Sequence, residues 1–550
     1  MIETLGLNAI QDEKARELIT RLLNMIEQLS AENRELKAEV QRLRDEINRM
    51  KGEQGKPDIK ANKPKTEEAS KHSSEKERHE GQEWHKGSKK AQIEINREEV
   101  VKVNREELPG DAEFKGYEEV VVQDIVVKSD NVRFRKEKYY AASTQKSYEG
   151  EMPCGYEGQF GPGVKSLIPA LYFGMGMSEP KIHEFLTNMG LQISEGEVSN
   201  LLIKEKEEFH AEKEAVYEAG LKSTPYQHVD DTLTRVDGEN QHCHIVCNPV
   251  YTIYHTLPNK DRLSVLDVLR NMRPRGFRMN AEALGYLKNI KLSQATRQIL
   301  QKWGSEINMD ETTFQEGLKR LLPDLGEQQR KAITDAAAVA SYHKETGWPV
   351  IQALVCDDAP QFNWLTDWMM LCWVHEGRPY KKLMPVVPQH REMLDNFLKK
   401  FWDYYHQLLA YKQKPSDEER TRLETEFDML FATRTGYDAL DKRIAKTQAK
   451  KNSLLLVLKH PELPLHNNPA ELEARQRVRK RDISFGPRTL EGRKAWDTFM
   501  SLAETTKKLG VSFYAYLRDR ITGTYAIPPL AELIEKAAKQ LNLGKPWAVT

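Results

Sequence analysis

A heptad repeat near the N-terminus is the feature that most restricts how this chain can fold. Between residues 19 and 50, one set of positions carries β-branched residues and one asparagine, and the alternating set carries leucine in four of five places. This spacing predicts a helix with a narrow apolar stripe, and its residue types favour a parallel two-stranded coiled coil. The asparagine lowers stability but fixes the register. The positions expected to pair are Ile19, Leu22, Ile26, Leu29, Asn33, Leu36, Val40 and Leu43.

The alternative is a single amphipathic helix that packs on the protein's own body. A helix that covers an ordinary core has a wider apolar face than this stripe. We therefore expect self-pairing, and with it a homodimer or a higher oligomer.

The 550 residues exceed one ordinary domain, so we expect several units. The pattern indicates a coiled-coil helix at 1–52, a flexible charged linker at 53–92, a small β-rich domain at 93–155 and a helical domain at 156–222. An α/β core follows in three parts, and helical insertions separate them. The core parts are 223–275, 349–384 and 463–550, and the insertions are 276–348 and 385–462.

Charge and apolar content exclude some classes of protein. The 83 Lys and Arg residues balance the 83 Asp and Glu residues, so nucleic-acid binding has to come from local patches. The five cysteines are scattered and odd in number, which is typical of reduced thiols and not of a disulfide framework. No apolar run reaches the roughly 20 residues of a membrane span, and we expect a soluble intracellular protein without a membrane partner.

Two local motifs precede the core. Residues 118–127 and 132–140 read as the arms of a β-hairpin with its turn at 129–131. Further on, two helices are expected on either side of Gly190, with Ser194 as an N-cap. They form either a DNA-binding helix-turn-helix or an ordinary packed pair.

Three acidic residues stand where the ends of core elements are expected. Asp230 lies in the first of three successive strands, Asp357 ends a buried apolar strand, and Glu471 lies in the first turn of a late helix. Phosphodiester chemistry with two metal ions needs carboxylates gathered at one side of a sheet. The pattern alone is weak, because acids also end strands and begin turns. Glu471 has a specific alternative, a capping box in which Asn468 is the N-cap.

Basic residues follow Glu471 at helical spacing. Residues 473–494 contain eight Lys or Arg and three Asp or Glu. Phosphate contacts supply most of the affinity for DNA, so this face is a candidate DNA surface. The residues expected to contact DNA are Arg475, Arg479, Lys480, Arg481 and Arg488.

A zinc site is not expected. His242, Cys243, His244 and Cys247 have metal-binding side chains, but alternate residues of a strand point to opposite faces.

Several motifs together resemble a known family. The stretches "HVDDT", "LVCDDAPQF", "LCWVH" and "LHNNPAELEARQRV", with "SFGPRTLEGRKAWDTFMSLAETTKKLGVSFYAYL", are similar to the large transposase of the insertion sequence 66 family. These are bacterial DDE transposases, and the similarity runs from the heptad repeat to about Leu517. It implies an α/β ribonuclease H-like catalytic core with large helical insertions. A parallel coiled coil, a small β-hairpin domain and a helix-turn-helix-like helical domain would precede that core.

The resemblance also implies roles for individual residues. Asp230, Asp357 and Glu471 would be the catalytic, metal-binding acids, with Asp358 as an alternative for the second. His228 and His375 would contact the metal-binding acids without binding the metal themselves. Asp358 would do the same if it is not itself the second acid. Asp231 stands where the family usually has Glu, and Leu472 where it usually has Arg. Many relatives have a cysteine-paired zinc motif near residues 93–155, whereas this chain has only Cys154 there.

The implied function is cleavage of transposon ends and strand transfer to target DNA with two Mg²⁺ ions, for which Mn²⁺ would substitute. The implied partners are double-stranded transposon-end and target DNA, a second copy of the chain, and short accessory proteins of the same element. The location would be the bacterial cytoplasm, at the nucleoid. Two alternatives stay open. One is a catalytically silent DNA-binding relic that acts as a repressor or scaffold. The other is a ribonuclease H-like nuclease without strand transfer.

Overall fold

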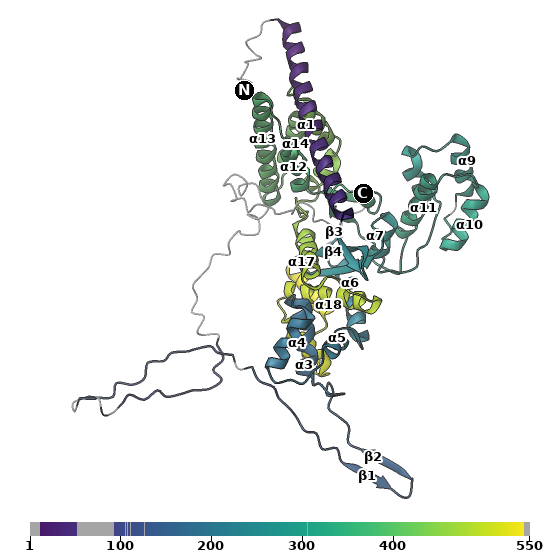
Figure 1. The fold of residues 1–550 in the computed structure, drawn as a ribbon. Helices are drawn as coiled ribbons and strands as arrows, with labels where there is room; N and C mark the ends of the chain where they lie inside the picture. The colour runs from purple at the N-terminus through teal and green to yellow at the C-terminus, as the bar shows by residue number, and fades with distance from the viewer. Residues whose placement is uncertain are drawn as a thin grey trace.

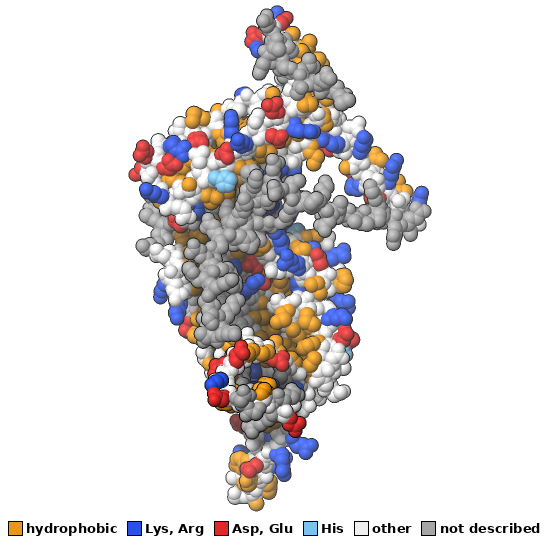
Figure 2. Space-filling view, turned by 90° about the vertical axis from the view of Figure 1, so that its left-hand side faces the viewer, with side chains coloured by type: hydrophobic (Ala, Val, Ile, Leu, Met, Phe, Trp, Pro, Cys, Tyr) orange, Lys and Arg blue, Asp and Glu red, His pale blue; other side chains and the backbone are white. Residues whose placement is uncertain are grey.

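The computed structural model describes residues 12–51 and 93–543, apart from residues 105, 107, 110, 111, 126 and 305. The linker expected at 53–92 lies outside the described residues. Among the helices of the described ranges, none combines the length and the apolar character that crossing a membrane requires. On the face shown in Figure 2, basic and acidic side chains are interspersed, in keeping with the zero formal net charge.

The heptad segment forms one long helix, as predicted. Helix α1 spans Glu13–Met50 and lies beside the helices of the second insertion (Figure 1). One face contacts this body, where Leu23 is buried and the Glu27 carboxylate accepts hydrogen bonds from the backbone N–H groups of Val386 (2.9 Å) and Val387 (2.7 Å). The apolar stripe is a different face, and most of its side chains are exposed, Leu29 to 61% and Leu36 to 66%.

The hairpin predicted at residues 118–140 is wrong in position. The described residues between 93 and 137 contain no strand, and the hairpin consists of β1 (Lys138–Ala141) and β2 (Lys146–Glu149). It projects from the body in Figure 1. The side chains of Val120, Val122, Ile125 and Val127 are exposed, so the alternation gains little buried surface there. The observed hairpin instead pairs Tyr139 directly with Tyr148.

The helical domain confirms the two helices around Gly190. Gly190 has φ +80°, a left-handed conformation that glycine adopts without strain. Ser194 caps the second helix by accepting a hydrogen bond from the N–H of Glu197 (3.2 Å). That second helix, α5, contains two glutamates and neither lysine nor arginine, so it offers no cation to a phosphate. The elements are α3 (Pro162–Pro169), η5 (Ala170–Gly174), α4 (Glu179–Asn188), α5 (Glu195–Ile203) and α6 (Glu207–Lys222).

A five-stranded mixed sheet forms the core. The strand order is β5-β4-β3-β6-β7, in which β3, β4 and β5 are antiparallel neighbours and β6 and β7 run parallel to β3. The three successive strands and the buried strand were predicted, and β6 is buried along its whole length. The strands are β3 (Tyr226–Val236), β4 (Glu239–Asn248), β5 (Tyr251–Leu257), β6 (Ala353–Cys356) and β7 (Trp368–Leu371).

Late helices complete the core. Helix α17 (Asn468–Ser484) lies against β3 and β4, and α18 (Leu490–Lys508) lies against β5. Helix α18 protects the edge of the sheet, because its side chains accept the backbone N–H groups that β5 would otherwise expose. The donors are Thr252, Tyr254 and Thr256, and their acceptors are Thr505, Ser501 and Asp497. Helices α19 (Phe513–Ile521) and α20 (Leu530–Gln540) end the described chain.

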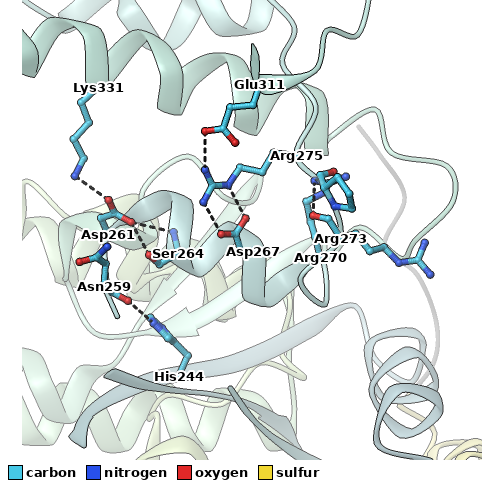
Figure 3. A network of polar contacts seen from close by, with 11 residues as sticks. His244, Asn259, Asp261, Ser264, Asp267, Arg270, Arg273, Arg275, Glu311 and Lys331 are labelled. Carbon is cyan, nitrogen blue, oxygen red and sulfur yellow. Dashed lines mark hydrogen bonds and ion pairs between the residues drawn. The ribbon is translucent and has the colours of Figure 1, made fainter. Parts of the chain in front are cut away.

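The first insertion is fastened to α7 (Arg262–Leu269), the helix that follows β5 and that was predicted over these residues. Figure 3 shows this network: Asp261 pairs with Lys331 (3.0 Å), and Arg275 bridges Asp267 (2.6 Å) and Glu311 (3.5 Å). Its elements are α8 (Ala281–Tyr286), η6 (Leu287–Asn289), α9 (Gln294–Trp303), α10 (Glu311–Leu321) and α11 (Glu327–Tyr342).

The second insertion follows α12 (Trp373–Lys382), the helix that comes directly after β7. The two share an aromatic core, in which Trp373 of α12 lies among Phe401, Tyr404, Phe427 and Phe431. The elements of the insertion are α13 (Pro388–Gln413), α14 (Asp417–Phe431), α15 (Asp438–Gln448), α16 (Lys451–Leu454) and η8 (Leu456–Leu458).

Candidate active site

Two of the predicted acids belong to neighbouring parallel strands: Asp230 lies on β3, and Asp357 directly follows β6. In the register of β3 and β6, His228 is opposite Val355. Asp230 and Asp357 each follow two residues later, so the same register brings them level with one another. Their electrostatic coupling agrees with this, because the charge of Asp357 contributes to raising the pKa of Asp230.

The third acid reaches this place through the start of α17. Asn467, just before the helix, contacts His228 Nδ1 with its Oδ1 (2.9 Å) and donates from Nδ2 to the carbonyl of Val229 (2.7 Å). Its backbone N–H also donates to Cys372 Sγ (3.2 Å). Asn467 therefore fixes the first turn of α17 on β3, beside Asp230. The charge of Glu471 also contributes to raising the pKa of Asp230.

The capping box predicted for Glu471 is wrong. The N-cap of α17 is Asn467, not Asn468, and the helix has no side-chain cap hydrogen bond. The Glu471 carboxylate faces α12 instead, where Arg378 Nη2 donates to its Oε2 (2.8 Å) and His375 Nδ1 lies 3.3 Å from Oε1. Because the Asn467 side chain forms its hydrogen bonds with β3, the sheet holds the start of α17.

The surroundings of Asp230 and Asp357 disfavour the ionised forms of their carboxyl groups. Burial, together with the charges of Asp357 and Glu471, raises the pKa of Asp230 to about 7. Burial also raises the pKa of Asp357. A divalent cation among these carboxylates would offset this repulsion. Glu471 Oε1 is buried and makes no hydrogen bond, which leaves it available as a ligand. Such oxygen donors suit Mg²⁺ or Mn²⁺, so the residues fit the expected ions.

A second possible metal site overlaps this cluster. Ligand atoms of Cys372, His375 and Glu471 lie within 4.8 Å of one another. A sulfur, nitrogen and oxygen set of this kind suits zinc. However, burial raises the pKa of Cys372 to about 11, which favours the neutral thiol, and its sulfur already accepts the N–H of Asn467. These contacts speak against Cys372 as a thiolate ligand, and among the described residues Asp230, Asp357 and Glu471 are not gathered within 4.8 Å of one another.

Asp358 points away from Asp230. Its side chain is half exposed and pairs with Lys450 of the second insertion at 2.5 Å. His228 is buried behind Asp230 on the same strand and is held by Asn467. His375 lies against Glu471 itself, and burial lowers its pKa. The site thus contains Asp357 in the place beside Asp230, with Asp358 turned toward the insertion.

The expected DNA-contacting residues differ in their exposure. Arg479 and Arg488 are exposed, and Arg475 is half exposed with its guanidinium 3.7 Å from Glu471. Arg481 is partly covered and donates to the carbonyl of Leu233 (2.5 Å).

Lys480 does not fit the expectation that it contacts DNA. It is 3% exposed, donates to the carbonyl of Met177 (3.0 Å) and lies over the ring of Tyr172. Burial lowers its pKa to about 6. Its side chain therefore belongs to the packing between α17 and the helical domain.

Two residues of the site were not singled out from the sequence. Asn467 belongs to the "HNNPAELEAR" motif, where its neighbour Asn468 was taken as the cap. Arg378 stands one helical turn after His375 in α12, and that spacing was the available signal for a residue on the same face.

Two comparisons with known proteins find similarity to this chain. A model described as transposase IS66 family matches residues 287–495, a segment that contains Asp357 and Glu471. The chain is also similar to the uncharacterized protein y4jO of Sinorhizobium fredii (strain NBRC 101917 / NGR234). The two are 33% identical over 321 residues, which cover 58% of this chain and 99% of that protein.

Proposed function

Because the chain belongs to the transposase IS66 family, we propose that it cleaves transposon ends and joins them to target DNA with Asp230, Asp357 and Glu471 as its catalytic acids. The observation that carries this proposal is their convergence. Asp230 lies on β3, Asp357 follows the end of β6, and Glu471 lies in the first turn of α17. The charges of Asp357 and Glu471 both contribute to raising the pKa of Asp230.

The sheet supports a ribonuclease H-like assignment for the core. Three antiparallel strands are followed by two that run parallel to the first, and the first strand lies at the centre of the sheet. In this arrangement Asp230 lies on β3 and Asp357 directly follows the neighbouring strand β6, which supports their assignment as the first and second acids. The helical insertions fall after α7 and after β7, outside the sheet.

The three carboxylates would hold two divalent cations, Mg²⁺ or Mn²⁺. When bound, such ions lower the pKa of water and stabilise the oxygen that leaves phosphorus. Asp230 and Asp357 are fixed by the sheet, and Glu471 is fixed by Asn467 and by the side chains of α12. The chain thereby presents its acids with little freedom to rearrange, which is what positioning of a phosphodiester requires.

The first reaction is hydrolysis of a phosphodiester at the transposon end. The oxygen of water forms a bond to phosphorus, the bond from phosphorus to the 3′ oxygen breaks, and a 3′-hydroxyl and a 5′-phosphate result. In strand transfer, that 3′-hydroxyl attacks a phosphodiester of the target, and the target's own 3′ oxygen leaves with the proton. The exposed Arg475, Arg479 and Arg488 would contact DNA phosphates beside the site.

Helix α1 would pair with α1 of a second copy. Its apolar stripe is exposed along the helix although another face of α1 is attached to the body. Figure 2 shows hydrophobic side chains at the upper end of the molecule, where Figure 1 places α1. A dimer would bring together two sites, one for each transposon end.

The test is Mg²⁺-dependent cleavage of a duplex that carries the element's terminal repeat. Wild type should cleave it, whereas Glu471→Gln should bind the same DNA and leave it intact. Glu491→Gln is the matched control, since Glu491 lies in the exposed first turn of α18. Cleavage by Glu471→Gln would contradict the proposal. Cleavage without joining to target DNA would indicate a nuclease that lacks strand transfer.

A further inference from the structure

Helix α12 contains a buried carboxylate that faces the second insertion. Glu376 is 4% exposed. Its Oε1 accepts a hydrogen bond from Thr447 Oγ1 (2.6 Å), its Oε2 pairs with Lys450 Nζ (3.0 Å), and Arg443 contacts it as well. Thr447 and Arg443 belong to α15, and Lys450 is the N-cap residue of α16.

Lys450 makes a second ion pair, and this one is at the candidate active site. Its Nζ lies 2.5 Å from Oδ2 of Asp358, the residue that directly follows Asp357. The lysine side chain is 19% exposed, so its pair with buried Glu376 is sheltered from solvent, whereas its pair with half-exposed Asp358 lies at the surface. One ammonium thus ties the turn that follows β6 to the buried carboxylate of α12.

A neighbouring face of α12 contacts the third acid. His375 and Arg378 both reach the Glu471 carboxylate, and Arg378 also contacts the His375 ring. The position of α12 therefore affects the third acid, whereas Lys450 affects the turn of the second acid. Both depend on the same buried cluster around Glu376.

Stability alone is a weak reason for such a cluster. Removing charges from water is costly, and well-packed apolar residues of similar volume often stabilise a protein as well or better. A buried ion pair does, however, restrict geometry, because each partner must stay within reach of the other. Metal-binding carboxylates need this kind of support from the residues behind them.

We propose that Lys450 and Glu376 are positioning residues which set the second and third acids relative to each other, so that the second helical insertion braces the metal site. This inference rests on the proposed function in one respect, the assignment of Asp357 and Glu471 as metal-binding acids.

The experiment measures Mn²⁺ binding to the full chain by electron paramagnetic resonance, with thermal unfolding as a check on the fold. Lys450→Met should weaken Mn²⁺ binding by about tenfold, the lower end of the range for residues that support metal ligands. Lys450→Arg should restore most of it. Lys451→Met is the matched control, because Lys451 pairs with Asp428 (2.6 Å) on the insertion's surface and should leave Mn²⁺ binding unchanged.

Unchanged Mn²⁺ binding in a folded Lys450→Met protein would overturn the proposal, and so would an equal loss in Lys451→Met. If Lys450→Met does not fold, Asp358→Asn removes the contact at the active-site end and leaves the pair with Glu376 in place. That variant should weaken Mn²⁺ binding several-fold, and wild-type binding would again overturn the proposal. Wild type that binds no Mn²⁺ at the acids would instead refute the proposed function.

Discussion

Replacing Asp230 with asparagine should stabilise the metal-free protein at alkaline pH while it abolishes cleavage. The reason is the acidic cluster. Burial and the charges of Asp357 and Glu471 raise the pKa of Asp230 from its ordinary 3.8 to about 7. An asparagine is similar in size and cannot ionise, so it avoids the cost of placing a charge there.

The sign and the size follow from linkage between protonation and folding. Between pH 3.8 and about 7, the unfolded state loses the proton that the folded state retains, so the free energy of unfolding falls as pH rises. Above pH 7 the full penalty applies, and a rise in pKa from 3.8 to about 7 corresponds to about 4 kcal/mol. Near pH 4 the penalty is absent. We expect Asp230→Asn to gain about 2–4 kcal/mol at pH 8, because asparagine also loses the hydrogen bonds that suit a carboxylate.

The assay is urea and thermal unfolding in EDTA at pH 8 and at pH 5. Asp230→Asn should have the higher unfolding midpoint at pH 8, and the difference should shrink at pH 5. Asp231→Asn is the control, because Asp231 is the next residue on the strand and lies 3.6 Å from Lys260. Excess Mg²⁺ should then stabilise wild type more than Asp230→Asn, by about 2.7 kcal/mol at one hundred times the Kd. An Asp230→Asn protein that is less stable than wild type at pH 8 in EDTA would refute the reasoning.

Three further predictions concern the elements that hold the site. The double variant Leu29→Glu, Leu36→Glu should convert an oligomer into a monomer of unchanged thermal stability, because both side chains are exposed within one chain. Light scattering measures the mass, and an unchanged mass would count against a coiled coil. Asn467→Ala should lower the free energy of unfolding by about 2–4 kcal/mol, since two buried hydrogen bonds to β3 are lost and their partners stay unpaired. Urea unfolding measures this loss, and a loss under about 1 kcal/mol would show that other contacts hold the start of α17. Glu27→Ala should speed hydrogen exchange of the amides of Val386 and Val387 at least about tenfold, because each amide loses a charged acceptor worth about 1.5–3 kcal/mol. Unchanged exchange would mean that α1 does not contact this loop in solution.

Sequence periodicity predicted the elements that depend on buried surface. The three strands of 226–257, the buried strand at 353–356 and the helix at 262–269 appear where they were expected. Each has a pattern that fits one element only, because its apolar residues face a core that the same pattern requires. The three acids were named through the resemblance to a family, because their pattern alone was weak, and their catalytic role stays a prediction.

The predictions that were wrong share one cause: tertiary contacts overrode the conformation or exposure that the local sequence favours. A glutamate at the third position of a helix reads as a cap, yet Glu471 is drawn toward Arg378 of α12. A lysine in a basic helix reads as exposed, yet Lys480 packs on the helical domain. The attachment of α1 to the body uses Glu27, an acid on the polar side of a heptad repeat. No local pattern distinguishes such residues from their exposed neighbours.

The most direct test of the account is the position of Mn²⁺ in crystals of the full chain, measured from anomalous scattering. We expect anomalous peaks among the carboxylates of Asp230, Asp357 and Glu471, with Arg378 displaced from the glutamate. A peak among Cys372, His375 and Glu471, with Asp230 and Asp357 free of metal, would contradict it.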